Sequence, residues 1–344
     1  MTAIVAHGPK DLRLETRDDD LVGVGQVRVH MARGGICGSD LHYYRHGGFG
    51  TVRLKEPMIL GHEVAGHISE IGSEVIGLSV GDLVAVSPSR PNWQSAQSQA
   101  GRPNHCEDMR FYGSAMPFPH IQGAFRTSLV ADASQCALAT GLSPAEAAMA
   151  EPLAVTLHAA DQAGSLLGKR VLITGCGPIG LLCLLVARRN GAAEVVVTDI
   201  APFPLQTALD NGADQTLNVA ETPDAMDVFT ANKGHFDVLF ECSGVAAALT
   251  SAVPAMRPQG VIVQLGLGGD MVLPVQAMTA KELTFRGSFR FHWEFHQGVE
   301  LMRKGLIDTK PLITHTLPLA KAVEAFDLAG DRSQAIKAQI AFKD

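Results

Sequence analysis

The N-terminal half of the sequence contains four residues of the types that bind metal ions: Cys37, His62, Glu63 and Glu151. Thiolate, imidazole and carboxylate groups are the ligands that a catalytic zinc ion uses when it keeps one tetrahedral position open. A lone cysteine or histidine is more often a structural residue. Here, however, the His-Glu pair lies between glycines, and Glu151 directly precedes a proline. These features predict an open zinc site at a cleft.

A second group of residues has the glycine spacing of a phosphate-binding turn, and it reads Gly175-Cys176-Gly177-Pro178-Ile179-Gly180. Glycines at this spacing allow a tight turn and the close approach of a pyrophosphate, whose charge meets the N-terminus of the next helix. Asp199 follows about 20 residues later, where it would bind the adenosine ribose and repel a 2′-phosphate. No Arg or Lys occurs at 200–204. The segment predicts binding of NAD, with NADP less favoured; the alternative is a glycine turn that binds nothing.

The elements that must position these groups can be recognised from the hydrophobic pattern. Apolar strands are expected at 170–174, 194–199, 236–241 and 260–265, with a helix at 179–190. Strands separated by helix-length segments predict parallel β-α-β units and a doubly wound sheet.

The first hundred residues differ from this pattern. Short alternating stretches, such as 26–32, and glycine-rich corners predict a β-rich unit there. Residues 143–163 predict one or two buried helices that cross into the second unit. The last part of the chain returns to a mixed character and ends with an apolar stretch at 335–342.

Composition excludes several classes of function. With 344 residues, of which 46% are hydrophobic, the chain is expected to form about two domains. A net charge of −7 gives no drive toward nucleic acid or anionic membranes, so neither is an expected partner. The six scattered cysteines favour the reducing cytoplasm. No signal peptide is recognised, and the longest apolar run is about half of the ~20 residues that a membrane span needs.

Together, the motifs resemble those of the zinc-containing medium-chain dehydrogenases over nearly the whole chain. The resemblance rests on 37–40, on 61–63 with Gly66, Gly72 and Val75, and on the turn at 175–180. It implies an α/β protein with a β-rich, GroES-like catalytic domain at 1–150 and 288–344. A doubly wound, parallel-sheet Rossmann domain at 151–287 would bind NAD and be inserted into the first.

Within this family, Glu151 replaces a cysteine of the simple alcohol dehydrogenases, as in the sorbitol dehydrogenase-type polyol branch. Residues 108–116, 150–155 and 286–291 most resemble the L-idonate 5-dehydrogenases. This implies zinc-dependent hydride transfer between NAD and a sugar acid, with L-idonate oxidised to 5-keto-D-gluconate. The first alternative is a polyol dehydrogenase acting on sorbitol, xylitol or galactitol. A zinc-free quinone reductase-like protein or a structural protein is disfavoured by the four ligand-type residues. A third option is a sensor that binds NAD and turns over nothing.

The resemblance also implies roles for residues near the metal. Cys37 and His62 would bind zinc, and Glu63 and Glu151 would share the remaining positions, with the direct ligand left open between them. Asp40 would orient His62, since metal-bound imidazoles usually need such a partner. Ser39 and His42 would relay the hydroxyl proton to solvent, although His42 could instead be a surface histidine.

Further residues are implied for the cofactor and the substrate. The nicotinamide would lie against Leu265, Gly266, Leu267, Phe289 and Arg290. The substrate hydroxyls would face Tyr43, Glu151 and Arg290, while Phe291 lacks the hydroxyl that sorbitol dehydrogenases tend to have there. A sugar acid also needs a cation for its carboxylate, and Arg290 and Arg110 are the candidates. The alternative for Arg110 is a surface ion pair.

One departure from the family pattern concerns its second, structural zinc, which is held by four cysteines. The matching positions here are Asn92, Ser95, Ser98 and Cys106. Because amide and hydroxyl groups cannot replace the thiolates of such a closed site, we expect one zinc per chain. The segment would instead be held by packing or by a neighbouring subunit of a homodimer or homotetramer.

Overall fold

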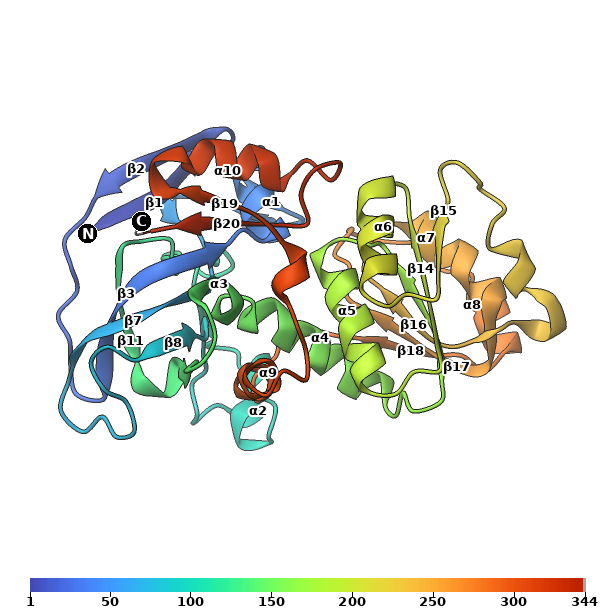
Figure 1. Cartoon of the computed structure of the whole chain (residues 1–344), viewed down its shortest axis with the longest axis horizontal. Coiled ribbons are helices and arrows are strands. Elements are labelled where there is room, and N and C mark those ends of the chain that lie inside the picture. The colour runs from blue at the N-terminus through green and yellow to red at the C-terminus, as the bar shows by residue number, and fades with distance from the viewer. Residues whose placement is uncertain (343–344) are drawn as a thin grey trace.

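Two sheets of different kinds dominate the structure, a computed structural model that describes residues 1–342 (Figure 1). A mixed sheet lies on the side that holds both chain ends, and a parallel sheet lies on the other side. Helix α4 (Ala150–Ala163) lies between them, and α9 (Glu294–Arg303) packs on α4. No helix among the described residues is long and apolar enough to cross a membrane.

The mixed sheet joins early strands to the C-terminal ones. Its order is β12-β8-β7-β3-β20-β19, and β11 also pairs with β3. In that order the strands are β12 (Cys136–Leu138), β8 (Leu83–Val86), β7 (Glu63–Ile71), β3 (Gln26–Gly35), β20 (Lys337–Ala341) and β19 (Ile313–Pro318), with β11 (Ser128–Asp132). Alternate residues of β3, such as Val27 and Val29, are buried, which is the pattern of a strand with one face in the core. The predicted β-rich unit is thus present, and its sheet includes the C-terminal strands.

Shorter elements surround this sheet. The strands are β1 (Thr2–Gly8), β2 (Asp11–Thr16), β4 (Gly48–Phe49), β5 (Val52–Arg53), β6 (Met58–Ile59), β9 (Ser89–Arg90) and β10 (Arg110–Phe111). The helices are α1 (Gly38–His46), α2 (Ala96–Gln99), α3 (Pro144–Ala147) and α10 (Ala322–Ala329). Of these, α1 and β10 bring side chains to the candidate site, together with β7 of the mixed sheet.

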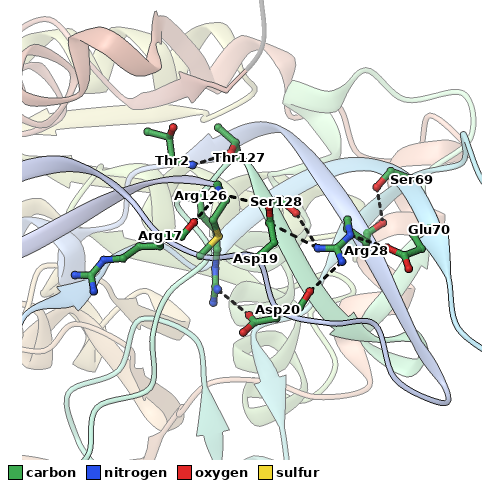
Figure 2. A network of polar contacts seen from close by, with 11 residues as sticks. Thr2, Arg17, Asp19, Asp20, Arg28, Ser69, Glu70, Arg126, Thr127 and Ser128 are labelled. Carbon is green, nitrogen blue, oxygen red and sulfur yellow. Dashed lines mark hydrogen bonds and ion pairs between the residues drawn. The ribbon is translucent and has the colours of Figure 1, made fainter.

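A polar network fastens the segment before β3 to the outside of this sheet (Figure 2). Arg28 donates from Nε to Glu70 Oε2 over 2.8 Å and from Nη2 to the Asp20 carbonyl over 2.9 Å. Arg126, which is almost fully buried, donates to Asp20 Oδ2 over 3.3 Å. Burial lowers the pKa of Arg126, and Asp20 partly offsets this effect. The network has a structural role on this outer surface.

The second sheet is parallel throughout, in the order β15-β14-β13-β16-β17-β18. Its strands are β13 (Arg170–Thr174), β14 (Glu194–Asp199), β15 (Gln215–Asn218), β16 (Phe236–Glu241), β17 (Met256–Gln264) and β18 (Thr284–Gly287). Its helices are α5 (Pro178–Arg189), α6 (Pro202–Asp210), α7 (Ala246–Ala252) and α8 (Val275–Ala280). The strand order reverses between β13 and β16, which is where such sheets bind ligands.

Both faces of the parallel sheet are covered, as expected for a doubly wound fold. Val171 and Ile173 of β13 pack into the apolar cluster that contains α4 and α5, whereas Leu172 packs into the cluster that contains α7. Since successive side chains of a strand point to opposite faces, one strand serves both layers.

The predicted doubly wound sheet is confirmed, and its first three predicted strands coincide with β13, β14 and β16. Helix α5 begins one residue earlier than predicted, at Pro178, because a proline is well tolerated at the first helical position, where its missing N–H is not needed. The helical stretch at 143–163 forms two helices, α3 and α4. The predicted strand at 260–265 is the last part of the longer β17.

Candidate metal and dinucleotide site

Three of the four predicted ligand residues lie together. Cys37 is the residue before α1, His62 lies between β6 and β7, and Glu63 begins β7. One potential ligand atom from each of the three lies within 4.8 Å of the others. Within residues 1–342, this is the one group of three or more such side chains with metal-binding geometry. A thiol, an imidazole and a carboxylate around one point fit a zinc ion with an open fourth position.

Asp40 holds the segments that carry these ligands. Its side chain is fully buried; Oδ1 accepts the Gly61 N–H over 3.0 Å, and Oδ2 accepts the Cys37 N–H over 3.1 Å. Asp40 Oδ1 is also 3.8 Å from His62 Nδ1, a buried atom that has no hydrogen-bond partner. Burial opposes the charged form of His62, but Asp40 and Cys37 outweigh this effect and raise its pKa well above the usual value. The carboxylate therefore fixes the backbone of both segments and lies beside the His62 ring nitrogen.

Sequence analysis missed Lys337, which forms a buried ion pair with Glu63. Lys337 Nζ donates to Glu63 Oε1 over 2.8 Å and to Oε2 over 2.7 Å, and also to the Ile36 carbonyl. Both side chains are almost fully buried. The pairing follows from strand register, because Gly35 of β3 lies opposite Glu63 on one side and Gln339 of β20 on the other. A lysine inside the apolar stretch at 335–342 was the available signal for such a partner.

Gly35 leaves the space in which the Glu63 carboxylate lies. A Cβ atom at Gly35 would be only 2.1 Å from Glu63 Oε2. Any larger residue would therefore displace the carboxylate from both the metal cluster and Lys337.

Glu151 lies outside the three-residue cluster, in the first turn of α4. Its side chain is buried, and burial raises its pKa to about 7, while His62 lowers that pKa and Glu63 raises it. A second acid therefore lies within electrostatic range of the ligands.

Aromatic rings form one wall beside the cluster. The Phe111 ring is 5.8 Å from the His62 ring and 6.5 Å from the Phe291 ring. The Arg290 guanidinium lies over Phe111, 4.5 Å from the ring centroid, and over Phe289 at 4.9 Å. Burial lowers the pKa of Arg290, and Tyr43 and Glu151 partly offset this effect. The structure thus brings a cation to the metal site.

Arg110, the other candidate cation, is exposed. It precedes Phe111 on the short strand β10. Because successive side chains of a strand point to opposite faces, and Phe111 faces His62, Arg110 points away from the metal cluster. The structure therefore does not bring it to the other site residues.

Helix α1 carries three further predicted site residues, Ser39, His42 and Tyr43. Tyr43 is buried, and its hydroxyl oxygen accepts the Ala115 N–H over 3.0 Å. His42 is exposed beside Phe49, and burial of part of its ring lowers its pKa. Ser39 is partly buried in the first turn, one residue before Asp40. The helix therefore extends from the metal cluster to solvent.

The glycine-rich turn lies between β13 and α5, as predicted. Gly175 has a φ of 86°, which favours glycine. A Cβ atom at Gly180 would be 1.9 Å from the Gly175 carbonyl oxygen, whereas one at Gly177 would meet no atom within 4 Å. Gly180 thus allows the helix to pack on the turn, and Gly177 leaves open space at the start of α5. The geometry fits a pyrophosphate at the helix N-terminus.

Asp199 ends β14 and makes more contacts than expected. Its Oδ1 accepts the N–H groups of Ile200 and Ala201 over 2.7 and 3.0 Å, and Oδ2 accepts the Cys176 N–H over 2.6 Å. Oδ2 also pairs with Arg332, a residue that the sequence analysis missed and that lies near the C-terminal end. No local signal pointed to Arg332, because its partner is far away in the sequence.

Glu241 holds the loops on the β16 side of the point where the strand order reverses. It is a fully buried carboxylate at the end of β16 and was also not predicted. Its oxygens accept the N–H groups of Ser243 and Gly244 over 2.9 and 3.1 Å and the Gln264 amide over 2.5 Å. A Cβ at Gly266 would be 2.1 Å from the Gly244 nitrogen, so the loops after β16 and β17 are in close contact. Leu265 is partly buried at the start of its loop, and Leu267 is largely exposed.

The segment that matches the family's structural zinc site contains a hydrogen-bonded cluster. The Ser95 hydroxyl donates to Ser98 Oγ over 3.0 Å, and the Asn92 N–H donates to Cys106 Sγ over 3.2 Å. The polar groups at the four positions therefore form hydrogen bonds with one another, in two pairs.

Comparison with known proteins agrees with this geometry. The model of the alcohol dehydrogenase GroES-like domain matches residues 23–141, and that of the zinc-binding dehydrogenase matches residues 178–304. L-idonate 5-dehydrogenase (NAD(P)(+)) of Escherichia coli strain K12 is 43% identical over 344 residues, covering 98% of each chain. Sorbitol dehydrogenase of Gallus gallus is 38% identical over 330 residues, covering 94% of this chain and 92% of its own.

Among solved structures, L-idonate 5-dehydrogenase from Escherichia coli superposes with a TM-score of 0.95 at 41% identity, covering 99% of this chain and 98% of that one. The GroES-like and Rossmann parts of the expected fold are both confirmed. With its ligand cluster, phosphate-binding turn and full-length similarity, the chain belongs to the zinc-containing medium-chain alcohol and polyol dehydrogenases.

Proposed function

We propose that this dehydrogenase oxidises L-idonate to 5-keto-D-gluconate reversibly, with one zinc ion per chain and NAD. The observation that carries the proposal is the Arg290 guanidinium, held over Phe111 while Phe111 contacts the ligand His62. A sugar acid differs from a polyol by its carboxylate, and an arginine at the metal site offers that group a partner. The relative at 43% identity supports the same substrate.

The metal would be held by Cys37, His62 and Glu63, whose ligand atoms lie together. Glu151, which the structure leaves outside that cluster, would act beside it. When bound, zinc lowers the pKa of an alcohol as a Lewis acid, and NAD accepts the hydride. Asp40 holds His62 and Cys37 in place, and Lys337 holds Glu63.

Proton transfer to solvent is assigned to Ser39 and His42. Both lie on α1 next to the ligand Cys37, and His42 is exposed at the outer end of this path. Burial lowers the pKa of His42, and the nearby His46 and Arg45 lower it further, which favours the neutral imidazole, the form that can accept a proton. Tyr43 and Arg290 would contact the substrate hydroxyls and the carboxylate, respectively, and Arg110 would not take part.

The cofactor would bind across the crevice between β13 and β16. The N–H groups at the start of α5, with Gly175, Gly177, Pro178, Ile179 and Gly180, would receive the pyrophosphate, and Asp199 the adenosine ribose. Leu265, Gly266, Leu267, Phe289 and Arg290 would enclose the nicotinamide. These residues would exclude water from one side of the reacting carbon, which would favour hydride transfer.

The remaining proposals concern the whole protein. The hydrogen-bonded cluster of Asn92, Ser95, Ser98 and Cys106 supports a single zinc per chain. Six cysteines without disulfides among the described residues support a cytoplasmic location.

Strand β18 is an exposed edge of the parallel sheet, and its pairing with a second copy would form a homodimer or a larger homo-oligomer. We place the domain boundaries at 150/151 and 287/288.

The substrate proposal is tested by measuring NAD reduction with L-idonate, sorbitol, xylitol and galactitol at equal concentration and fixed pH. We expect L-idonate to be oxidised fastest, and Arg290→Leu to lower its kcat/KM more than that of sorbitol. A polyol that is turned over much faster than L-idonate would establish the polyol dehydrogenase alternative. Reduction that persists after complete removal of metal would favour the quinone reductase-like class.

A further inference from the structure

An arginine from the C-terminal part of the chain reaches the acid at the adenosine end of the dinucleotide crevice. Arg332 Nη2 lies 2.5 Å from Asp199 Oδ2, although 133 residues separate the two in sequence. Arg332 belongs to the loop between α10 and β20, which in Figure 1 extends from the mixed sheet toward α6. A cation therefore stands at a position where residues 200–204 supply none.

The turn that carries Arg332 is held by its own hydrogen bonds. Asp331 Oδ1 accepts from the Ser333 N–H over 3.0 Å and from the Ser333 hydroxyl over 2.6 Å, and Oδ2 accepts from the Gln334 amide over 2.6 Å. The Ala335 N–H also donates to the Asp331 carbonyl over 3.0 Å. Arg332 thus extends from an ordered turn.

The partners of Asp199 differ in their freedom to move. Three of them are backbone N–H groups, from Cys176, Ile200 and Ala201, which the turn and the end of β14 hold in place. The fourth is the Arg332 side chain, which is 52% exposed, whereas that of Asp199 is 2% exposed. Of the four, the guanidinium can therefore turn toward a ligand without a change in the backbone.

The ion pair also changes the electrostatics of this position. An unpaired aspartate would repel the 2′-phosphate of NADP, which is the basis for expecting NADP to be less favoured than NAD. Here the positive charge of Arg332 offsets the negative charge of Asp199. A guanidinium also retains several N–H donors after one of them is engaged. Arginine binds phosphate with paired, charge-assisted hydrogen bonds.

We propose that Arg332 receives the 2′-phosphate of NADP, so that this one crevice accepts NADP as well as NAD. This inference rests on the proposed function only in that a dinucleotide occupies the glycine-rich turn. With NAD, the guanidinium turns aside from Asp199 Oδ2, and the ribose hydroxyls bind the carboxylate in its place. With NADP, the guanidinium turns from Asp199 to the phosphate.

Direct binding tests the proposal without a substrate. Dissociation constants for NAD, NADP, 5′-AMP and 2′,5′-ADP are measured by calorimetry on the wild type, Arg332→Ala and Arg332→Lys. We expect Arg332→Ala to weaken NADP and 2′,5′-ADP binding about 10- to 100-fold, as for loss of a hydrogen bond between charged groups, and to change NAD and 5′-AMP binding little. Arg332→Lys keeps the charge but not the paired geometry, so an intermediate loss is expected.

Arg189→Ala is the matched control, because this exposed arginine lies at the far end of α5 and its removal changes the net charge equally. It is expected to leave all four constants unchanged. Equal weakening of NADP and NAD in Arg332→Ala, or no weakening of NADP, would overturn the proposal. If the wild type binds NAD but not NADP, the Arg332 inference is wrong while the proposed function stands. If the wild type binds none of the four ligands, both are wrong.

Discussion

In the phosphate-binding turn, consecutive residues from Gly175 to Gly180 supply the bend, the open space and the helix start. The candidate metal site instead combines Cys37, His62 and Glu63 from separate segments, and Glu63 is held by Lys337, which is 274 residues away in sequence. The first site depends on backbone conformation and on the absence of side chains. The second depends on buried charges that the fold must bring together. Substitutions in the two regions should therefore impair different properties: NAD affinity at the turn, and zinc binding or stability at the candidate metal site.

The largest effect is expected from loss of a metal ligand. His62→Ala should remove zinc and lower kcat about 10³-fold, because metal stabilisation of the transition state is worth several kcal/mol. NAD binding should be retained, since the turn lies in another part of the structure. Zinc content, kcat and NAD affinity are measured on the same preparation.

His67→Ala is the control for this variant, because His67 is an exposed histidine on the same strand as Glu63. It should keep both zinc and activity. Full zinc content in His62→Ala would show that His62 is not a ligand. Loss of NAD binding in proportion to zinc would show that the two regions are not independent.

The next largest effect concerns the buried ion pair. Lys337→Met leaves the Glu63 charge buried without its partner, and breaking such a pair costs about 3–5 kcal/mol. We expect the free energy of unfolding, measured in denaturant with a chelator present, to fall by that amount. Adding Glu63→Gln to Lys337→Met should recover most of the loss, because the uncompensated charge is then removed. Equal stability of the single and double variants would refute a charge-based role for Lys337.

The glycine-rich turn offers a smaller effect and an internal comparison. Gly180→Ala places Cβ against the Gly175 carbonyl and should lower the free energy of unfolding by about 1–3 kcal/mol. Gly177→Ala meets no protein atom, so stability should change by less than about 0.5 kcal/mol, while NAD affinity falls because the methyl group enters the space assigned to pyrophosphate. Both variants should retain zinc. Unchanged NAD affinity in Gly177→Ala would place the pyrophosphate elsewhere.

The smallest effect is expected in the segment that lacks the structural thiols. Cys106→Ser keeps a polar group beside the Asn92 N–H, so stability should change by about 1 kcal/mol or less, and zinc per chain should stay the same. Elemental analysis and thermal unfolding check both. A fall in zinc content would show that Cys106 holds a second ion.

These contrasts also explain how far the sequence could be interpreted. Strands β13, β14 and β16 and the phosphate-binding turn were predictable, because each is specified by neighbouring residues. Cys37, His62 and Glu63 were also recognisable as possible ligands from residue type and motif. The distinction between Glu63 and Glu151 was not, because it depends on how α4 packs near β7.

The charge partners were the least predictable part. Lys337 meets Glu63 only because β20 and β7 both pair with β3, and Arg332 meets Asp199 only because a loop of the mixed sheet reaches the parallel sheet. Arg110 and Arg290 were both candidates for the substrate carboxylate, and the alternation along β10 places the Arg110 side chain away from the metal cluster. Sequence proximity supplies none of these relations.

The most direct test of the account measures zinc content and L-idonate-dependent NAD reduction together, before chelation, after chelation and after zinc is returned. The account predicts one zinc per chain, loss of activity in proportion to the zinc removed, and recovery on addition of zinc with NAD binding unchanged throughout. Activity that persists in metal-free protein, or two zinc ions per chain, would contradict it.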